Sequence, residues 1–335
     1  MNQSLPKIDV SGSPASVPGF SVGHASLEGR HSGVSVVLCP PGTVAGVEVM
    51  GSAPATRQLD GLTPGFWDGE VHAVCLTGGS SFGLDAAGGV VAWLEEQGRG
   101  LKLGDFILPK VPSAVIFDLP LNDGQGRPGP EVGRAACQAA SDGAMARGNV
   151  GAGLGATVGK LHGLGQAMKG GAGGASLSVG ELKVGALAVV NAFGDIRDES
   201  GRLIAGARKA PESLELADTE AWFMAGGKRS AFQPPDNTTL GVIATNAKLD
   251  KNSACKVAAM AHHGLVRAIQ PVHTTFDGDL VFNLASGQVE ADINGLGIMA
   301  AKTLQLAVYD AINSAQSLPG LPAARDLTKR HPGGE

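Results

Sequence analysis

Short apolar runs alternate along the chain with longer segments in which apolar residues recur at helical spacing. Runs rich in Val, Ile and Leu that end at polar residues or glycine predict buried strands. They fall at residues 34–39, 72–77, 114–117, 184–190, 240–245 and 280–284. The predicted helices cover residues 84–97, 131–147, 253–269 and 296–313. Strands mixed with helices of this length indicate a layered α/β fold, with Ser80 and Ser81 as candidate caps of the first helix.

Two stretches interrupt this pattern. Residues 148–176 are extremely rich in glycine, whereas residues 207–236 are polar and charged and close with Pro234-Pro235. The second stretch has the character of an exposed connector placed directly before a buried strand. Glycine supplies 51 of 335 residues and aromatic residues only 4%. Because the glycines are interleaved with aliphatic residues, they predict close approach of backbones to one another or to a ligand.

The net charge and the spacing of the cysteines limit which ligands and which cellular location we expect. A formal net charge of -5 gives no basic footprint for nucleic acid or an anionic membrane, so a small or neutral substrate fits better. The four cysteines form no C-x-x-C pair and no metal-ligand spacing, which predicts reduced thiols. The first residues lack the apolar run of a secretion signal, and no run approaches about 18 apolar residues. We expect a soluble, cytoplasmic protein with a single domain over residues 1–335.

A candidate reactive residue stands at the entrance of the strand predicted at residues 240–245. Thr238 follows Asn237 there, directly after the connector. Its hydroxyl can attack the preceding carbonyl group, move the acyl group from nitrogen to oxygen, and let water release a new N-terminus. Backbone strain of about 1–3 kcal/mol at that peptide would favour the step. The freed α-amine, with a reference pKa of about 7.7–8.0, can then act as base for its own hydroxyl.

The dipeptide alone does not separate this chemistry from an inert loop. Most Asn-Thr pairs are unreactive. Asn237-Thr238-Thr239 also satisfies the glycosylation sequon, which has no consequence in a reduced cytoplasm. The catalytic interpretation therefore depends on the wider sequence.

Six segments, in this order, resemble the L-aminopeptidase/D-esterase (DmpA-like) family of self-processing N-terminal-nucleophile hydrolases. They are CLTGGSSFGLDAAGGV (75–90), SAVIFDL (113–119), GAGLGATVGK (151–160), GALAVVNAFGD (185–195), DNTTLGVIATNAKL (236–249) and IQPVHTTFDGDLVF (269–282). The family includes β-peptidyl aminopeptidases and nylon-oligomer hydrolases and is distantly related to ornithine acetyltransferases. Threonine at the cut, together with the Asp-Gly-Asp segment, looks closest to the nylon-oligomer hydrolase branch.

The resemblance implies a fold, a cleavage and an assembly. The fold would be a four-layer α/β/β/α sandwich of the DmpA/ornithine acetyltransferase type. Thr238 would be the nucleophile and Asn237 the new C-terminus, so that residues 1–237 (alpha fragment) and 238–335 (beta fragment) remain parts of one domain. Cleaved alpha/beta units would form a homo-oligomer.

The same match assigns four supporting residues. Lys160 matches a lysine near the nucleophile hydroxyl, where an ammonium stabilises negative charge, and Asn191 matches an asparagine that can donate to an oxyanion. Asp277 and Asp279 match acidic residues that orient the new amino group. By residue type alone, Lys160 also fits an exposed loop lysine, Asn191 a turn residue, and Asp277-Gly278 a hairpin turn.

The expected substrate pocket involves Phe117, Ser80 and Ser81. The resemblance implies a small peptide or oligoamide substrate, cut by hydrolysis, with acyl transfer to an amine as the alternative. Phe117 stands where nylon-oligomer hydrolases have tyrosine, and the missing hydroxyl bears on the nylon-type substrate more than on self-cleavage. Ser80 and Ser81, in TGGSSFG, would form one pocket wall, although this segment could also bind an anion at a helix N-terminus.

Two other function classes match parts of the sequence. Gly151, Gly153 and Ala156 fit the G-x-G-x-x-A dinucleotide fingerprint of an oxidoreductase. A helix and turn precede them instead of the required strand, and no acidic residue follows about 20 positions later. A non-catalytic assembly or binding protein is the other class, and an uncleaved Thr238 would favour it.

A metal site is a further alternative. It would use His273, Asp277 and Asp279 with His262 or His263. The paired histidines fall in an Ala-rich predicted helix, where one is expected to face the core and the other the solvent, and no H-E-x-x-H pattern occurs. We therefore expect neither a metal nor a cofactor.

Overall fold

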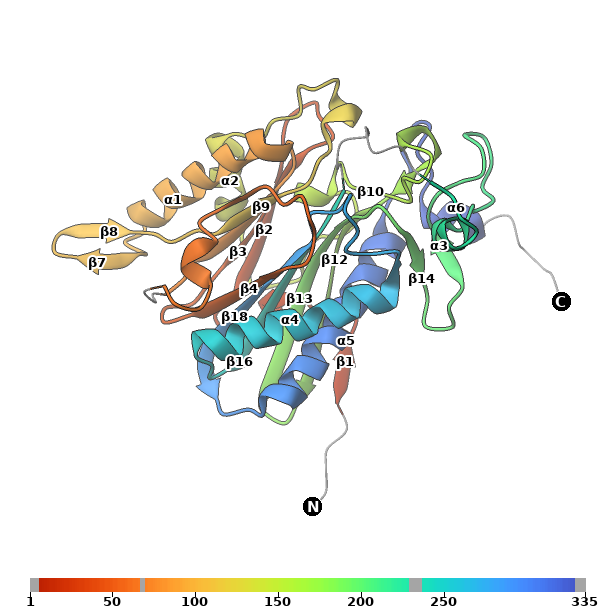
Figure 1. The fold of residues 1–335 in the computed structure, drawn as a ribbon. Helices are drawn as coiled ribbons and strands as arrows, with labels where there is room; N and C mark the ends of the chain where they lie inside the picture. The colour runs from red at the N-terminus through yellow and green to blue at the C-terminus, as the bar shows by residue number, and fades with distance from the viewer. Residues whose placement is uncertain (1–5, 67–69, 229–236, 329–335) are drawn as a thin grey trace, which may run out of the picture.

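Two β-sheets lie face to face, and helices cover the outer side of each sheet (Figure 1). The computed structural model describes residues 6–66, 70–228 and 237–328. From one side to the other, the layers are helices, a five-stranded sheet, a six-stranded sheet and helices. This four-layer α/β/β/α arrangement confirms the predicted fold class.

The six-stranded sheet contains the strand that begins at Thr238. Its strands, in spatial order, are β1 (Lys7–Asp9), β12 (Gly171–Val179), β13 (Leu182–Asn191), β16 (Thr238–Ala247), β18 (Leu280–Val289) and β4 (Val44–Val49). β16 pairs antiparallel with β13 and parallel with β18, so hydrogen bonds hold it on both sides. All ten residues of β16 are buried, which explains the apolar run at its centre, residues 240–244.

The second large sheet has five strands, and the described residues also form three small sheets. In spatial order the five strands are β2 (Ser21–Ser26), β3 (Gly33–Leu38), β6 (Ala73–Thr77), β9 (Ser113–Val115) and β5 (Thr56–Arg57). The small sheets are β15 (Leu203–Ala205) with β14 (Asp195–Arg197) and β17 (Ile269–Gln270); β10 (Thr157–Val158) with β11 (Met168–Lys169); and β7 (Leu101–Leu103) with β8 (Phe106–Leu108).

Four long helices form the outer layers. α1 (Ala86–Glu96) and α2 (Pro130–Gln138) cover the five-stranded sheet, while α4 (Lys251–Ala268) and α5 (Ile293–Ser314) cover the six-stranded sheet. The short helices are α3 (Thr219–Met224) and α6 (Ala324–Thr328). α4 and α5 begin at aspartate caps, where the side chains of Asp250 and Asp292 accept backbone N–H bonds from Ser253 and Gly295.

The strand β16 contributes to two separate cores. Leu240, Val242 and Ala244 lie in the core between the two sheets. Ile243 and Ala247 lie in the core beneath α4 and α5. Because side chains of a strand alternate between faces, a strand buried on both faces carries apolar side chains on both, as residues 240–244 do.

Glycine allows the helices to lie close to the sheet and to each other. A Cβ on Gly173 of β12 would lie 2.1 Å from the backbone nitrogen of Ala311 in α5. A Cβ on Gly264 of α4 would lie 2.1 Å from the carbonyl oxygen of Ala301 in α5. The close backbone approach predicted from composition is confirmed at these contacts.

Two sequence predictions about helix ends are wrong. The helix predicted at residues 131–147 is α2, which ends at Gln138 because the backbone of Ser141 pairs with Val22 of β2. Ser80 and Ser81 do not cap α1. Both lie inside a 3₁₀ helix, Ser80–Asp85, and no side-chain cap bond is formed at either helix start.

The other predicted elements are found with small shifts at their ends. The six predicted strands correspond to β3, β6, β9, β13, β16 and β18, and the remaining helices to α1, α4 and α5. The predicted connector contains α3, and its closing Pro234-Pro235 lies outside the described residues. Apolar periodicity therefore located the main elements, although not each of their ends.

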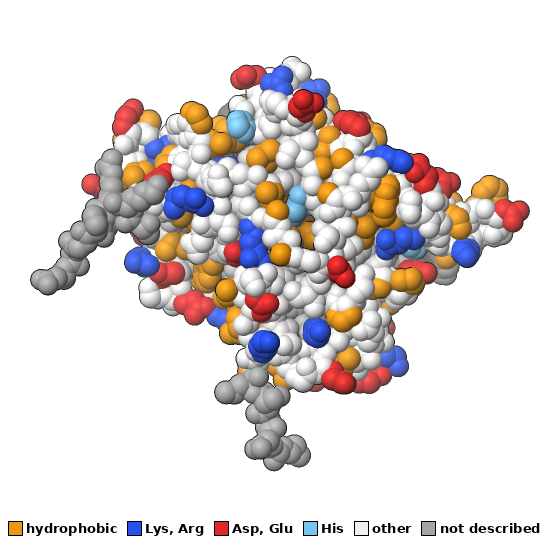
Figure 2. All heavy atoms as spheres, turned by 180° about the vertical axis from the view of Figure 1, so that it is seen from behind, with side chains coloured by type: hydrophobic (Ala, Val, Ile, Leu, Met, Phe, Trp, Pro, Cys, Tyr) orange, Lys and Arg blue, Asp and Glu red, His pale blue; other side chains and the backbone are white. Residues whose placement is uncertain are grey.

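The surface carries charges of both signs. On the face turned away from the viewer in Figure 1, basic and acidic side chains are interspersed and hydrophobic side chains are scattered, as Figure 2 shows. In the part of the chain that the structure describes, no helix is both long and apolar enough to cross a bilayer.

Candidate active site

Thr238 and Asn191 lie opposite each other in the six-stranded sheet. Asn191 is the last residue of β13 and Thr238 is the first of β16, and the antiparallel register pairs them directly. Asn191 is fully buried, and Thr238 is 6% exposed. Strand pairing thus brings these two predicted site residues together, and Asn191 ends a strand within the sheet instead of forming an exposed turn.

Lys160 reaches the same point from the loop that follows β10. Its Nζ lies 2.9 Å from the backbone oxygen of Asn191 and 2.9 Å from Oδ1 of the same residue. The backbone N–H of Lys160 donates to the carbonyl of Phe193 at 2.9 Å, which fixes the loop against the end of β13. Lys160 is 3% exposed, so the alternative of an exposed loop lysine is wrong.

The side chain of Asn191 is oriented by its other contacts. Its Oδ1 also accepts the backbone N–H of Thr157 at 3.0 Å, so this oxygen faces the loop that carries Lys160. Its Nδ2 points to the carbonyl oxygen of Phe117 at 3.4 Å. That distance is long for an N–H···O bond.

Asp279 is tied to the beginning of β16. It directly precedes β18, the parallel neighbour of β16, and its Oδ1 accepts the backbone N–H of Thr239 at 2.6 Å. Its Oδ2 accepts the backbone N–H of His273 at 3.1 Å and lies 2.9 Å from His273 Nδ1. The fully buried carboxylate thus holds the residue next to Thr238 in place.

Asp277 is also buried and accepts several N–H and O–H bonds. Its carboxyl oxygens accept from the backbone N–H of Phe193 at 3.2 Å and from the backbone N–H and hydroxyl of Thr274 at 3.0 and 2.6 Å. Burial, followed by the negative charge of Asp279, raises the pKa of Asp277 well above its usual range. The hairpin alternative is wrong, because β17 and β18 pair with other strands and not with each other.

The carbonyl oxygen of Asn237 lies between two hydrogen-bond donors. It accepts the backbone N–H of Gly278 at 2.8 Å and the hydroxyl of Thr238 at 2.5 Å. A Cβ on Gly278 would lie 2.9 Å from Oγ1 of Thr238. Sequence analysis missed this contact of Gly278, because the Asp-Gly-Asp segment was interpreted as a mark of the family branch and as a turn signal.

Phe117 and Ser80 lie on the side of the site formed by the five-stranded sheet. The carbonyl of Phe117 faces Asn191, and the backbone N–H of Ser80 donates to the carbonyl of Ile116 at 3.0 Å. Phe117 and Ser80 are half-buried, whereas Ser81 is exposed. The carbonyl of Phe117 thus contacts Asn191 directly, and Ser80 is hydrogen-bonded to Ile116, the residue before Phe117.

Sequence reasoning also missed a second buried lysine, Lys169. Its Nζ donates to the carbonyl oxygens of Gly153, Ala156 and Gly170 at 3.0, 2.8 and 2.9 Å. Burial lowers the pKa of this fully buried amine to about 7; the charge of Asp118 opposes this shift, and the charge of Lys160 adds to it. Lys169 therefore stabilises the loop that presents Lys160, a role that no local sequence pattern signals.

The dinucleotide alternative is not supported by the local structure. Gly151–Gly153 forms a 3₁₀ helix, and strand β10 begins four residues later at Thr157. The strand-turn-helix arrangement that holds a dinucleotide phosphate is therefore not formed at this fingerprint.

The residues proposed for a metal site do not form a set of metal ligands in the described structure. Within the described ranges, no group of three or more His, Cys, Asp or Glu side chains is placed to hold a metal ion. His262 is buried and His263 is exposed, as predicted for the histidine pair on α4. His262 instead contacts His273, which in turn contacts Asp279.

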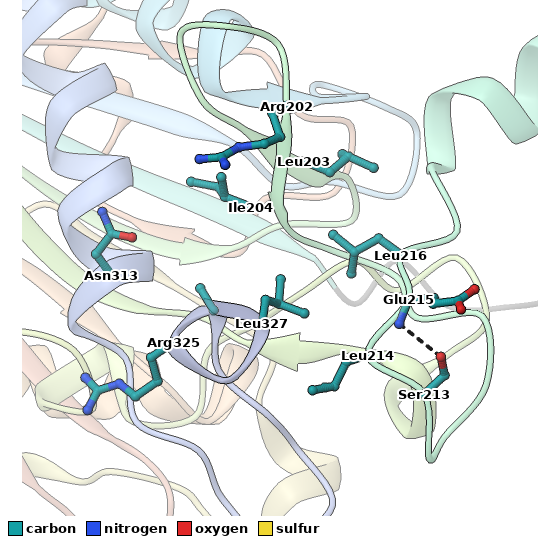
Figure 3. A pocket seen from close by; sticks show the side chains of 11 residues that line it. Arg202, Leu203, Ile204, Ser213, Leu214, Glu215, Leu216, Asn313, Arg325 and Leu327 are labelled. Atoms are coloured by element: carbon teal, nitrogen blue, oxygen red, sulfur yellow. Dashed lines mark hydrogen bonds between the residues drawn. The ribbon is translucent and has the colours of Figure 1, made fainter. Parts of the chain in front are cut away.

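A cavity of about 980 Å³ lies elsewhere, between β15, residues 213–216 and the C-terminal helices (Figure 3). Leucine side chains from several elements line it together with Arg202, Glu215 and Arg325. None of the predicted site residues is among its lining residues. The candidate active site is therefore formed by Thr238 and the residues around it, Lys160, Asn191, Asp277 and Asp279, and this cavity is not part of it.

Sequence comparison places the chain in a known family. Residues 15–325 match peptidase family S58. An uncharacterized aminopeptidase of Mycobacterium tuberculosis is 40% identical over 342 residues, which cover 93% of this chain and 96% of the relative. The 6-aminohexanoate-oligomer endohydrolase of Paenarthrobacter ureafaciens is 30% identical over 311 residues, which cover 88% of this chain and 84% of the relative.

Solved structures share the fold at lower identity. The beta-aminopeptidase of Burkholderia sp. superposes with a TM-score of 0.68 at 20% identity, covering 100% of this chain and 98% of the other. The L-aminopeptidase D-Ala-esterase/amidase of Ochrobactrum anthropi, described as a variant of the Ntn hydrolase fold, gives 0.70 at 18% identity, covering 96% and 93%. The resemblance drawn from the six sequence segments is confirmed: the chain belongs to peptidase family S58 and is a hydrolase of the peptidase/amidase type.

Proposed function

We propose that this hydrolase cuts its own chain between Asn237 and Thr238 and then uses Thr238 as an N-terminal nucleophile. The observation that carries the proposal is the environment of the Asn237 carbonyl oxygen, which accepts both the Thr238 hydroxyl at 2.5 Å and the Gly278 N–H at 2.8 Å. A carbonyl held by two donors is polarised, and a backbone N–H aimed at its oxygen is suited to stabilise an oxyanion.

In the proposed cleavage, Oγ1 of Thr238 attacks the carbonyl carbon of Asn237, and the Gly278 N–H stabilises the resulting oxyanion. The bond from that carbon to the Thr238 nitrogen breaks, and the hydroxyl proton passes to the departing nitrogen. Water then hydrolyses the remaining ester. The products are a carboxyl group on Asn237 and a free hydroxyl and α-amine on Thr238.

In the processed enzyme, the neutral α-amine takes the proton of its own hydroxyl as Oγ1 attacks the substrate amide. The substrate's amine leaves with a proton, and water releases the acid from the Thr238 ester. Lys160 supplies positive charge beside Asn191, whose Nδ2 can donate to the substrate oxyanion. The carboxyl groups of Asp277 and Asp279 accept backbone N–H bonds near Thr238 and would thus fix the position of its new α-amine.

The two fragments would remain one domain after the cut. β16, which begins the fragment 238–335, pairs with β13 of the fragment 1–237 and with β18 of its own fragment. The core between the sheets also contains side chains from both fragments. These contacts support a cleaved alpha/beta unit that stays folded, and we propose that such units assemble as a homo-oligomer.

The proposed substrate is a short peptide or linear oligoamide, and water is the acyl acceptor. Relatives named as aminopeptidases and as oligoamide hydrolases support amide chemistry on small chains. Phe117 offers no hydroxyl to the substrate, so its contribution to the pocket is apolar. Cys39, Cys75 and Cys137 are buried as free thiols and Cys255 is half-buried, which supports a reducing, cytoplasmic setting.

The cleavage is tested by intact mass spectrometry and denaturing gels on wild-type protein and three variants. Wild type and Thr238→Ser should give two fragments whose masses fit a cut after Asn237, while Thr238→Ala should stay a single inactive chain. Thr239→Val is the matched control, because the neighbouring hydroxyl has no hydrogen-bond partner in the structure. An active wild-type protein that remains one unbroken chain would refute the proposal.

Substrate class is tested separately on the processed enzyme. A panel of amino acid p-nitroanilides and linear ω-amino oligomers would separate aminopeptidase from oligoamide hydrolase activity. Adding a free amine acceptor distinguishes hydrolysis from acyl transfer, because transfer would yield the acylated amine in place of the free acid.

A further inference from the structure

The side chain of Asn237 is buried against the loop that joins β17 to β18. Asn237 directly precedes Thr238 and is only 2% exposed. Its Nδ2 donates to the carbonyl oxygen of Phe276 at 3.0 Å. Because a carbonyl oxygen only accepts, the nitrogen of the amide, and not its oxygen, must face Phe276. The contact therefore fixes the direction in which the amide points.

Three consecutive residues of that loop hold Asn237. Its backbone forms an isolated parallel bridge with Asp277, and its carbonyl oxygen accepts the Gly278 N–H at 2.8 Å. The side-chain bond to Phe276 adds a contact point outside the main chain. A residue that is held at both its backbone and its side chain has little freedom to rotate about the bonds that lead to its own carbonyl group. The direction of that carbonyl is therefore set by the loop.

The loop itself is fixed by contacts that do not involve Asn237. The backbone N–H of Phe276 donates to Oγ1 of Thr274 at 3.2 Å, and its ring packs against that of Phe193 with the centroids 5.1 Å apart. The carboxyl oxygens of Asp277 accept the backbone N–H groups of Phe193 and Thr274. The carbonyl of Phe276 thus offers a fixed acceptor to the amide of Asn237.

The amide oxygen of Asn237 is not satisfied in the same way. Within the described residues, its Oδ1 is buried and has no hydrogen-bond partner. A buried acceptor without a donor is unfavourable and uncommon in folded proteins. A leucine of similar shape would avoid this cost, so the stability of the fold does not favour asparagine here. The N–H donor is the property of asparagine that this position uses.

We propose that Asn237 is a positioning residue for self-cleavage: its side chain, held by the Phe276 carbonyl, aims the scissile carbonyl group at the Thr238 hydroxyl. This inference rests on the proposed cleavage between Asn237 and Thr238. The side-chain amide transfers no proton and forms no covalent bond in the reaction. It acts by orientation, and a displacement of reacting atoms by about 1 Å can cost about 100-fold in rate.

The cut ends this role of Asn237. Its carbonyl group is then no longer bonded to Thr238, so the orientation of the Asn237 side chain no longer aims an electrophile at the nucleophile. Turnover of a separate substrate instead depends on how that substrate binds beside Thr238. The rate of self-cleavage and the rate of turnover should therefore respond differently to a change at Asn237.

Two substitutions at Asn237 test the donor. Asn237→Leu removes it and nearly keeps the size of the side chain, whereas Asn237→Ala removes both. In full-length protein made by cell-free synthesis and followed during a chase, both variants should form the two fragments about 10- to 100-fold more slowly than wild type. Asn294→Leu, at an exposed position of α5, is the matched control and should cleave like wild type. Cleavage of Asn237→Leu at the wild-type rate would overturn the proposal.

Turnover by the cleaved fraction separates positioning from a structural role. With amino acid p-nitroanilides as probes, kcat per cleaved chain should differ from wild type by less than about threefold in Asn237→Leu. Equal losses in cleavage rate and kcat would contradict the inference, because they would indicate a distorted site.

Urea unfolding shows whether the variants fold, with uncleaved Thr238→Ala as the reference. Asn237→Ala provides the same kinetic test if leucine disturbs the fold, and loss of folding in both variants would assign the Phe276 contact to stability and refute the positioning role. A wild-type chain that is never cleaved refutes the proposed function itself, a result distinct from equal cleavage of wild type and variants.

Discussion

Lys160 and Asn191 are joined by two bonds from a single nitrogen. The Nζ of Lys160 lies 2.9 Å from both the backbone oxygen and Oδ1 of Asn191, and Asn191 pairs directly with Thr238. One ammonium therefore fixes the side chain that faces the proposed nucleophile and adds positive charge beside it.

Removing that ammonium should affect self-cleavage and substrate turnover together. Lys160→Met is expected to slow both by about 10²- to 10³-fold, because Asn191 loses its charged partner and the oxyanion loses nearby positive charge. Time courses of fragment formation and of p-nitroanilide hydrolysis measure the two rates. Lys102→Met, at an exposed lysine on β7, is the control. Unchanged rates in Lys160→Met would remove Lys160 from the site.

Gly278→Ala should impair cleavage while leaving the fold intact. The added Cβ would lie 2.9 Å from Oγ1 of Thr238 and 2.7 Å from the carbonyl oxygen of Ala53, so the hydroxyl or the loop must move. A displacement near 1 Å typically costs about 100-fold in rate. Gly88→Ala is the control, because its Cβ would enter open space on α1. Normal processing of Gly278→Ala would show that cleavage does not require the space beside Thr238 that the glycine leaves open.

Lys169→Met should destabilise the protein by about 2–4 kcal/mol, because three buried carbonyl oxygens lose their donor. Urea unfolding gives the free energy of unfolding, and Lys102→Met again serves as the control. If the loop that presents Lys160 also loosens, cleavage should slow in proportion. Equal stability of Lys169→Met and wild type would argue against a structural role for this amine.

The stability of the protein should depend on pH through Asp118. Burial raises the pKa of Asp118 to about 6, although its carboxylate accepts the Gly79 N–H at 2.7 Å. Between about pH 4 and 6 the unfolded chain has released this proton while the folded chain retains it, so the free energy of unfolding falls as pH rises. Above about pH 6 the contribution levels off.

Asp118→Asn should remove this part of the pH dependence. The amide can still accept the Gly79 N–H through its oxygen but does not titrate. The difference in unfolding free energy between variant and wild type should change by at most about 3 kcal/mol across pH 4–6. Urea denaturation at several pH values measures it, and a difference that stays constant would contradict the shifted pKa.

The sequence allowed the strand that begins at Thr238 to be predicted, but not how it pairs with its neighbours. The apolar residues within the segment 240–245 identified β16, because a strand that is buried on both faces is largely apolar. The pairing of Asn191 with Thr238 depends on strand register, and a slip by one residue would turn every side chain to the other face. The family resemblance, not apolar periodicity, brought these two residues together before the structure did.

The features that could not be predicted depend on tertiary contacts, which no local sequence pattern describes. The burial of Lys160 requires a glycine-rich loop to fold around Lys169, and no periodic pattern describes such a loop. The end of α2 depends on pairing between Ser141 and Val22, which are far apart in sequence. The hydrogen bonds of His273 likewise depend on a contact with α4.

Because β16 lies inside its sheet, the fold around it does not depend on the peptide bond before Thr238. A cut before Thr238 would break one peptide bond, while β13 and β18 would still hold β16 by hydrogen bonds along both edges. The two fragments should therefore co-elute in chromatography and separate only in denaturant. Produced apart, residues 238–335 would lack one flanking strand, so the proposed cleavage would have to follow folding.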